Sequence, residues 1–69
     1  MTLREIEELL ERDAFLPFRI FLSNGDTFDV TRRLSVAVGA TGLFIILPDH
    51  RWKWIPMAHI ASVETLQAA

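Results

Sequence analysis

The chain has 69 residues, of which 51% are hydrophobic and 23% charged, and its formal net charge is −2. This composition excludes a disordered polyelectrolyte, and the length allows a single domain, residues 1–69. The lack of cysteine excludes a disulfide framework, a thiolate zinc site and a thiol nucleophile, and it fits a reducing, cytoplasmic location. The weakly charged stretch 34–48 is shorter than the roughly 20 residues of a membrane span, so no membrane association is expected. A small domain without disulfides or a structural metal is usually stabilised by a partner subunit, and we expect a homo-oligomer.

The first segment, residues 2–13, is predicted to be an amphipathic helix. Thr2 and Glu5 have the spacing of a capping box, in which each side chain accepts a hydrogen bond from a backbone amide of the first turn. Apolar residues recur at helical spacing, at Leu3, Ile6, Leu9 and Leu10. A helix of about 12 residues is marginal alone, so its apolar side must pack on the rest of the chain.

The remainder is predicted to form five antiparallel strands, at residues 18–23, 26–38, 42–47, 51–56 and 60–65. The second strand is long and bent near Arg32. Asn24-Gly25 predicts a tight hairpin, because both residues tolerate positive φ. Residues 43–47 (LFIIL) are the most apolar run and are expected to be central and buried on both faces. The pattern predicts a mainly β fold with one amino-terminal helix, closed into a small barrel that hides its sheet edges.

This order of elements resembles the Sm-like fold of RNA-binding proteins, which includes the bacterial Hfq-type RNA chaperones. An apolar strand leading into a glycine turn opens that family's motif, and the matching positions are Ile20, Leu22, Asn24, Gly25 and Phe28. The family's closing motif is similar to residues 57–64 (MAHIASVE). The resemblance implies a five-stranded Sm-like or SH3-like barrel, with single-stranded RNA as a partner.

The chain departs from the Sm-like pattern where that family binds RNA. Its base-binding loop falls on residues 39–42 (GATG), which lack the family's aspartate and its asparagine or aromatic residue. Of the Hfq-type tyrosine-lysine-histidine run, His59 alone is present. Residues 17–30 (PFRIFLSNGDTFDV) are more similar to a group of short bacterial proteins of unknown function, which implies no activity.

Residues 51–54 (RWKW) are the most suggestive candidate site. Basic residues that alternate with aromatic ones can contact phosphates and stack bases. On a strand, however, Trp52 and Trp54 share one face while Arg51 and Lys53 share the other. We therefore expect both tryptophans to pack in the core or in a subunit interface, with a nucleic-acid platform as the alternative.

The other candidates are Arg32, Arg33, His50 and His59. The arginine pair is interpreted as a solvated bend, with an anion or RNA contact as the alternative. The two histidines lie in different predicted turns and have too few neighbouring ligands for zinc, but His59 could titrate at a subunit interface. The sequence shows no serine beside a base and no phosphate loop, so we predict no catalytic residue, cofactor or metal.

These observations predict a non-catalytic, self-associating protein-interaction module. The candidate contact residues are Trp52, Trp54, Arg32, Arg33 and His59. The alternative function is an Hfq-like or Sm-like single-stranded RNA-binding protein. A third interpretation, a small subunit of a larger enzyme or secretion complex, requires a protein partner and is not separated from the first by sequence.

Overall fold

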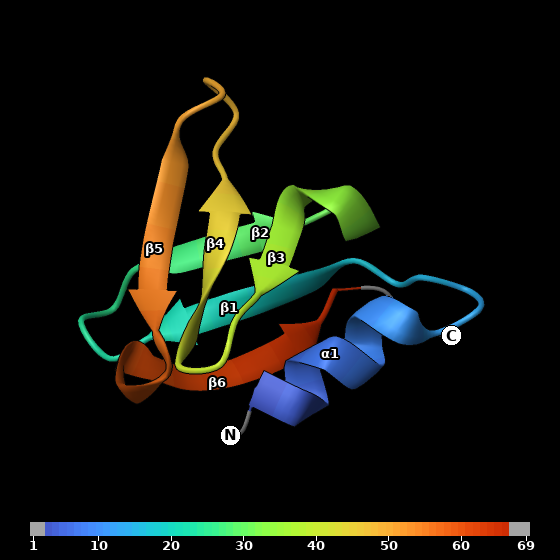
Figure 1. Cartoon of the computed structure of the whole chain (residues 1–69), viewed down its shortest axis with the longest axis horizontal. Helices are drawn as coiled ribbons and strands as arrows, with labels where there is room; N and C mark the ends of the chain where they lie inside the picture. Colours follow the sequence, from blue (N-terminus) through green and yellow to red (C-terminus); the bar gives the residue numbers. More distant parts are fainter. Residues whose placement is uncertain (1–2, 67–69) are drawn as a thin grey trace.

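A computed structural model describes residues 3–66, which form one α-helix and six β-strands (Figure 1). In chain order the elements are α1 (Leu3–Glu11), β1 (Phe18–Leu22), β2 (Thr27–Val30), the 3-10 turn η1 (Arg33–Ser35), β3 (Val36–Val38), β4 (Gly42–Ile46), β5 (Trp52–Pro56), the 3-10 turn η2 (Met57–His59) and β6 (Ile60–Thr65). The predicted mainly β fold with one amino-terminal helix is confirmed. The helix ends at Glu11 rather than at residue 13, and Thr2 of the predicted capping box lies outside the described residues.

The strands pair in two three-stranded antiparallel sheets, with the orders β2-β1-β6 and β3-β4-β5. Figure 1 shows the second sheet crossing in front of the first. The prediction that residues 43–47 supply a central strand is confirmed, because β4 lies between β3 and β5. The prediction that this strand is buried on both faces is wrong, since 45% of Phe44 is exposed on the outer face.

The segment predicted as one bent strand, residues 26–38, forms two strands in different sheets. Between β2 and β3 the chain makes η1, where the amide and hydroxyl of Ser35 donate to the carbonyl of Arg32 over 3.1 and 2.7 Å. A side chain that bonds to nearby backbone in this way competes with strand pairing. The described chain therefore has six strands in two hydrogen-bonded sheets, where the sequence predicts five strands in one closed barrel.

The core lies between the two sheets, because successive side chains in a strand point to opposite faces and most of the inward ones are apolar. Its buried residues are Ile6, Phe18, Ile20, Leu22, Val30, Val36, Leu43, Ile45, Ile55 and Ile60. Ile6 is the buried residue of α1, and partly buried leucines of the same helix pack against the core. The helix thus docks through the apolar side that the sequence predicts.

The β1–β2 hairpin closes with a three-residue loop, not with the two-residue turn that Asn24-Gly25 predicts. The Leu22 amide donates to the Asp26 carbonyl (2.9 Å), and the Leu22 carbonyl accepts from the Gly25 amide (3.0 Å). Gly25 has a φ of 94°, whereas Asn24 is not in the positive-φ region. The Asn24 side chain instead accepts a 2.9 Å hydrogen bond from the Asp26 amide, which is a common role for asparagine in turns.

The β4–β5 hairpin repeats the same loop. The Leu47 amide donates to the Arg51 carbonyl (2.8 Å), and the Leu47 carbonyl accepts from the His50 amide (2.9 Å). His50 takes the place that Gly25 has in the first loop, with a φ of 68°. The chain therefore carries a side chain at a position where glycine is the favoured residue.

We expect His50→Gly to raise the free energy of unfolding by about 0.5 kcal/mol, because glycine adopts positive φ without a steric cost. Urea denaturation followed by circular dichroism measures the change. Gly25→Ala is the matched reverse substitution and is expected to lower stability by about 1 kcal/mol. A destabilised His50→Gly would mean that the imidazole makes contacts that outweigh the backbone strain.

Candidate functional site

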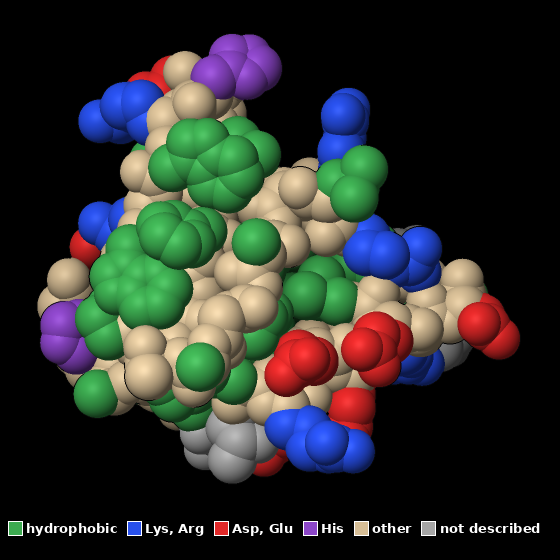
Figure 2. All heavy atoms as spheres, viewed as in Figure 1, with side chains coloured by type: hydrophobic (Ala, Val, Ile, Leu, Met, Phe, Trp, Pro, Cys, Tyr) green, Lys and Arg blue, Asp and Glu red, His purple; other side chains and the backbone are tan. Residues whose placement is uncertain are grey.

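The outer face of sheet β3-β4-β5 consists, within the described residues, of apolar positions. We call this set the aromatic face: Ala37, Phe44, Ile46, Trp52, Trp54 and Pro56. The three aromatic members are substantially exposed, Phe44 by 45%, Trp52 by 59% and Trp54 by 40%. Figure 2 shows hydrophobic side chains gathered on this side of the molecule, over β4 and β5. It is an exposed patch rather than part of the core.

The three rings of the aromatic face hold one another in place. The Phe44 and Trp54 centroids are 4.8 Å apart in a tilted arrangement, and those of Phe44 and Trp52 are 6.2 Å apart, edge to face. Leu47 and Arg51 form a hydrogen-bonded pair, and in an antiparallel ladder such pairs alternate with non-hydrogen-bonded ones. Phe44 and Trp54, three pairs further along, are therefore a non-hydrogen-bonded pair, in which the side chains approach more closely. Such cross-strand aromatic contacts stabilise the hairpin and fix the ring orientations.

The Trp54 indole also covers two glycines of the β3–β4 hairpin. A Cβ built on Gly42 would lie 2.8 Å from Cζ2 of Trp54, and one on Gly39 would lie 3.9 Å from the same ring system. The ring therefore rests on the backbone of the β3–β4 hairpin. This contact explains why Trp54 is less exposed than Trp52.

The predicted burial of Trp52 and Trp54 in the core is wrong, and their burial in a subunit interface stays a prediction. A strand buries its tryptophans in the core when they share the inward face, but here the inward face of β5 carries Lys53 and Ile55, of which Ile55 is 1% exposed. The predicted separation of tryptophans from cations is confirmed for Lys53. Its ammonium lies 5.6 Å from the ring centroid of Phe28, on the other side of the sheet.

Arg51 is engaged in an ion pair beside the hairpin loop. Its Nε lies 2.5 Å from Oδ2 of Asp49, and its amide donates to the Asp49 side chain at 3.2 Å. The hydrogen bond from the Arg51 amide, together with the guanidinium, lowers the pKa of Asp49. Neither cation of the predicted site is therefore directed at the aromatic face.

Arg33 lies at the exposed turn η1, as the solvated-bend interpretation expects, and its side chain also caps the carboxyl end of α1. Its Nε donates to the carbonyl of Leu10 (2.6 Å) and its Nη2 to the carbonyl of Arg12 (2.5 Å). The guanidinium also lies 5.6 Å from the centroid of the Phe15 ring. A cation at this position satisfies carbonyls that the helix leaves unbonded and complements the helix dipole.

We expect Arg33→Met to lower the free energy of unfolding by about 1–2 kcal/mol, because two helix carbonyls lose a charged donor. Arg33→Lys should recover part of that loss, since an ammonium reaches one carbonyl but lacks the guanidinium fork. Arg32→Met is the neighbouring control and should change stability by less than about 0.5 kcal/mol. Equal losses in the Met variants of Arg32 and Arg33 would contradict the capping role.

The outer face of sheet β2-β1-β6 is mainly polar, in contrast to the aromatic face. Arg19 of β1 bonds to Asp29 of β2 through Nε (2.7 Å) and Nη2 (3.2 Å). The hydrogen bond from Arg19 lowers the pKa of Asp29, and the same bond raises the pKa of Arg19. Ser62 and Glu64 of β6 lie beside Phe21 and Arg19 in the register of this face. The two sheets therefore present chemically different surfaces to the outside.

The histidines do not form a site together. His50 lies in the β4–β5 loop and His59 in η2, and Figure 2 shows the two histidine side chains far apart on the molecule. The backbone carbonyl of His59 accepts a 2.9 Å hydrogen bond from the Ser23 amide. Across residues 3–66, no group of three or more His, Asp or Glu side chains is placed to hold a metal ion. In the same range, no helix has the length and apolar character needed to cross a bilayer.

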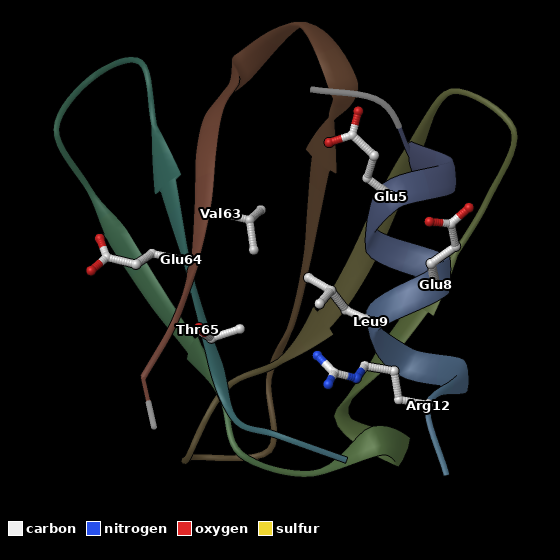
Figure 3. A pocket seen from close by; sticks show the side chains of 7 residues that line it. All are labelled: Glu5, Glu8, Leu9, Arg12, Val63, Glu64 and Thr65. Carbon is white, nitrogen blue, oxygen red and sulfur yellow. The ribbon is translucent and has the colours of Figure 1, made fainter. Parts of the chain in front are cut away.

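A hollow of about 690 Å³ lies between α1 and β6 (Figure 3). Figure 3 shows Leu9 of the helix directed toward Val63 and Thr65 of the strand, with Arg12 beside them and Glu64 directed away. Leucine and valine form the apolar part of the hollow. The rest of its lining is polar, with Arg12, Thr65 and three glutamates, Glu5, Glu8 and Glu64.

Comparison of the chain with protein-family models, with curated proteins and with solved structures found no match. Within the chain itself, Phe44 is the site residue that the sequence analysis missed. The sequence does contain a signal for Phe44. If residues 48–50 form the hairpin loop, the pairing of the two flanking strands places Phe44 opposite Trp54. That pairing puts Phe44 on the same face as the tryptophans.

Proposed function

We propose that this protein is a non-catalytic interaction module that self-associates through the aromatic face. The observation that carries the proposal is the exposure of three contacting aromatic rings on a sheet face without a charged side chain. Scattered apolar residues are normal on a protein surface, but a contiguous apolar patch marks an interaction site. Aromatic residues are also the side chains most enriched at the centres of protein interfaces.

A second copy of the chain is the partner that this surface fits best. Two identical apolar faces can pack on each other around a two-fold axis without placing an unpaired charge in the interface. Strands β3, β4 and β5 have three, five and five residues and lie about 4.8 Å apart, so they cover roughly 200 Å², well below the about 800 Å² per partner of a standard interface. We therefore expect a weak dimer with a dissociation constant in the micromolar range.

The arrangement of cations favours a protein partner over RNA. Stacking platforms for single strands combine exposed rings with cations that track the phosphates. Here Arg51 pairs with Asp49, Lys53 lies against Phe28, and Arg33 bonds to α1. The aromatic face thus offers rings on which RNA bases could stack, but it lacks cations beside those rings to contact the phosphates.

We also propose that the fold is an open form of the Sm-like or SH3-like barrel, in a cytoplasmic protein. Two features support the barrel assignment. The chain passes from the first sheet to the second at η1, close to Arg32, where the predicted strand bends. A 3-10 turn, η2, joins β5 to β6, so the last strand returns to the first sheet beside β1.

Light scattering after size exclusion, from about 1 µM to about 500 µM, tests the self-association. We expect the mass to rise from monomer toward dimer and the tryptophan emission to shift to the blue over the same range. A monomeric mass and unchanged emission at every concentration would contradict the proposal. Binding of single-stranded RNA that weakens from about 50 to 200 mM salt would support the alternative function instead.

A further inference from the structure

β2 has an open edge with backbone groups available for pairing. Among the described strands it pairs with β1 alone. The Leu22 amide donates to the Asp26 carbonyl, so Leu22 and Asp26 are a hydrogen-bonded pair of the antiparallel ladder. Every second residue from Asp26 onward, Phe28 and Val30, therefore bonds to β1 as well. By this alternation, the amides and carbonyls of Thr27 and Asp29 point away from β1. An edge of this kind is a template for an added strand.

A groove runs along this open edge. Two adjoining hollows of about 540 and 500 Å³ share Asp29, Ile46, Leu47 and Pro48 in their linings, so they are continuous. We call them together the β2 groove; it lies between β2 and the tip of the β4–β5 hairpin. Leu34, which is 90% exposed, lines one end. The groove therefore has a strand edge on one side and an apolar wall on the other.

The charges that remain unpaired around the β2 groove are positive. Asp29 is neutralised by Arg19 and Asp49 by the neighbouring Arg51. At the end beside η1, the side chain of Arg32 has no ionic or hydrogen-bonding partner among the described residues.

Lys53 adds a further cation near the other end of the groove, where its ammonium lies against the Phe28 ring. An acidic ligand would therefore be complementary to the groove.

We propose that the β2 groove binds an extended segment of a partner protein as an added strand, with an acidic residue of the segment facing Arg32. Backbone hydrogen bonds to Thr27 and Asp29 would hold the segment, and its apolar side chains would pack on Leu47 and Pro48. At about 3.3 Å per residue, the four residues of β2 match a segment of four to five residues. This site is separate from the self-association proposed above, although Ile46 borders both surfaces.

Fluorescence anisotropy with synthetic peptides tests this site, at protein concentrations where light scattering gives the monomeric mass. The probes are two labelled seven-residue peptides in which valine and threonine alternate. One peptide carries two aspartates at its amino end, and the other carries them at its carboxyl end. We expect one of them to bind, and the same peptide with lysines for aspartates to bind at least about tenfold more weakly. Arg32→Gln should weaken the binding of the acidic peptide about tenfold, whereas Arg12→Gln, directly after α1, should leave its affinity unchanged.

N-methylated versions of the binding peptide test the strand geometry without changing the protein. Alternate peptide amides face β2, so methylating that set should abolish binding, while methylating the other set should leave it intact. Equal effects of the two sets would overturn strand addition. Failure of both acidic peptides to bind, undiminished affinity in Arg32→Gln, or binding of oligonucleotides in place of peptides would each overturn the proposal. None of these results depends on whether the protein dimerises.

Discussion

Gly42→Ala is expected to remove more than half of the free energy of unfolding of the protein. A Cβ at this position would lie 2.4 Å from the carbonyl oxygen of Ile55, 2.8 Å from the Trp54 ring and 2.9 Å from Cα of Pro56. Two of these three atoms belong to the backbone of β5, so relief requires β4 and β5 to move apart. Overpacking of this kind costs about 3 kcal/mol. A domain of this size has a total stability of about 5 kcal/mol, so the expected loss is more than half of it.

Gly39→Ala is the matched control for that experiment. Its added Cβ would meet the Gly42 carbonyl at 3.4 Å and the Trp54 ring at 3.9 Å, which are ordinary contacts. Urea denaturation of both variants should therefore separate them by about 2 kcal/mol or more. Similar midpoints would mean that β4 and β5 can shift freely, and that Trp54 does not pin the strands together.

Much of the fold could be predicted from local sequence patterns. The helical spacing of Ile6 with its flanking leucines predicts α1, and the glycine at Gly25 predicts the first hairpin. These features depend on residues close together in the chain. The division of residues 26–38 into β2 and β3 could not be predicted in this way, because alternation continues through η1. The break depends on Ser35 bonding back to Arg32 and on where the two sheets meet.

The candidate site was predicted less completely, for a similar reason. Trp52 and Trp54 were recognised as a pair on one face, but strand alternation does not say whether that face is inner or outer. Ile55 settles it, because burying this residue turns both tryptophans outward. The role of Arg33 depends on contacts to carbonyls 21 and 23 residues away in the chain, at Arg12 and Leu10, which no local motif indicates.

Trp52→Lys is expected to abolish self-association while leaving the monomer folded. With 59% of its surface exposed and one edge contact to Phe44, Trp52 contributes little to the monomer, so unfolding stability should change by less than about 1 kcal/mol. In the dimer, the ammonium would be buried against an apolar face without a partner, which should weaken association by about 3 kcal/mol or more. Thr27→Lys, at an exposed strand position of the other sheet, is the matched control and should dimerise normally. If Trp52→Lys still forms a dimer by light scattering, the aromatic face is not the contact surface. If the variant unfolds instead, Trp52 supports the monomer more than its exposure indicates. Trp52→Ser then tests association without a buried charge.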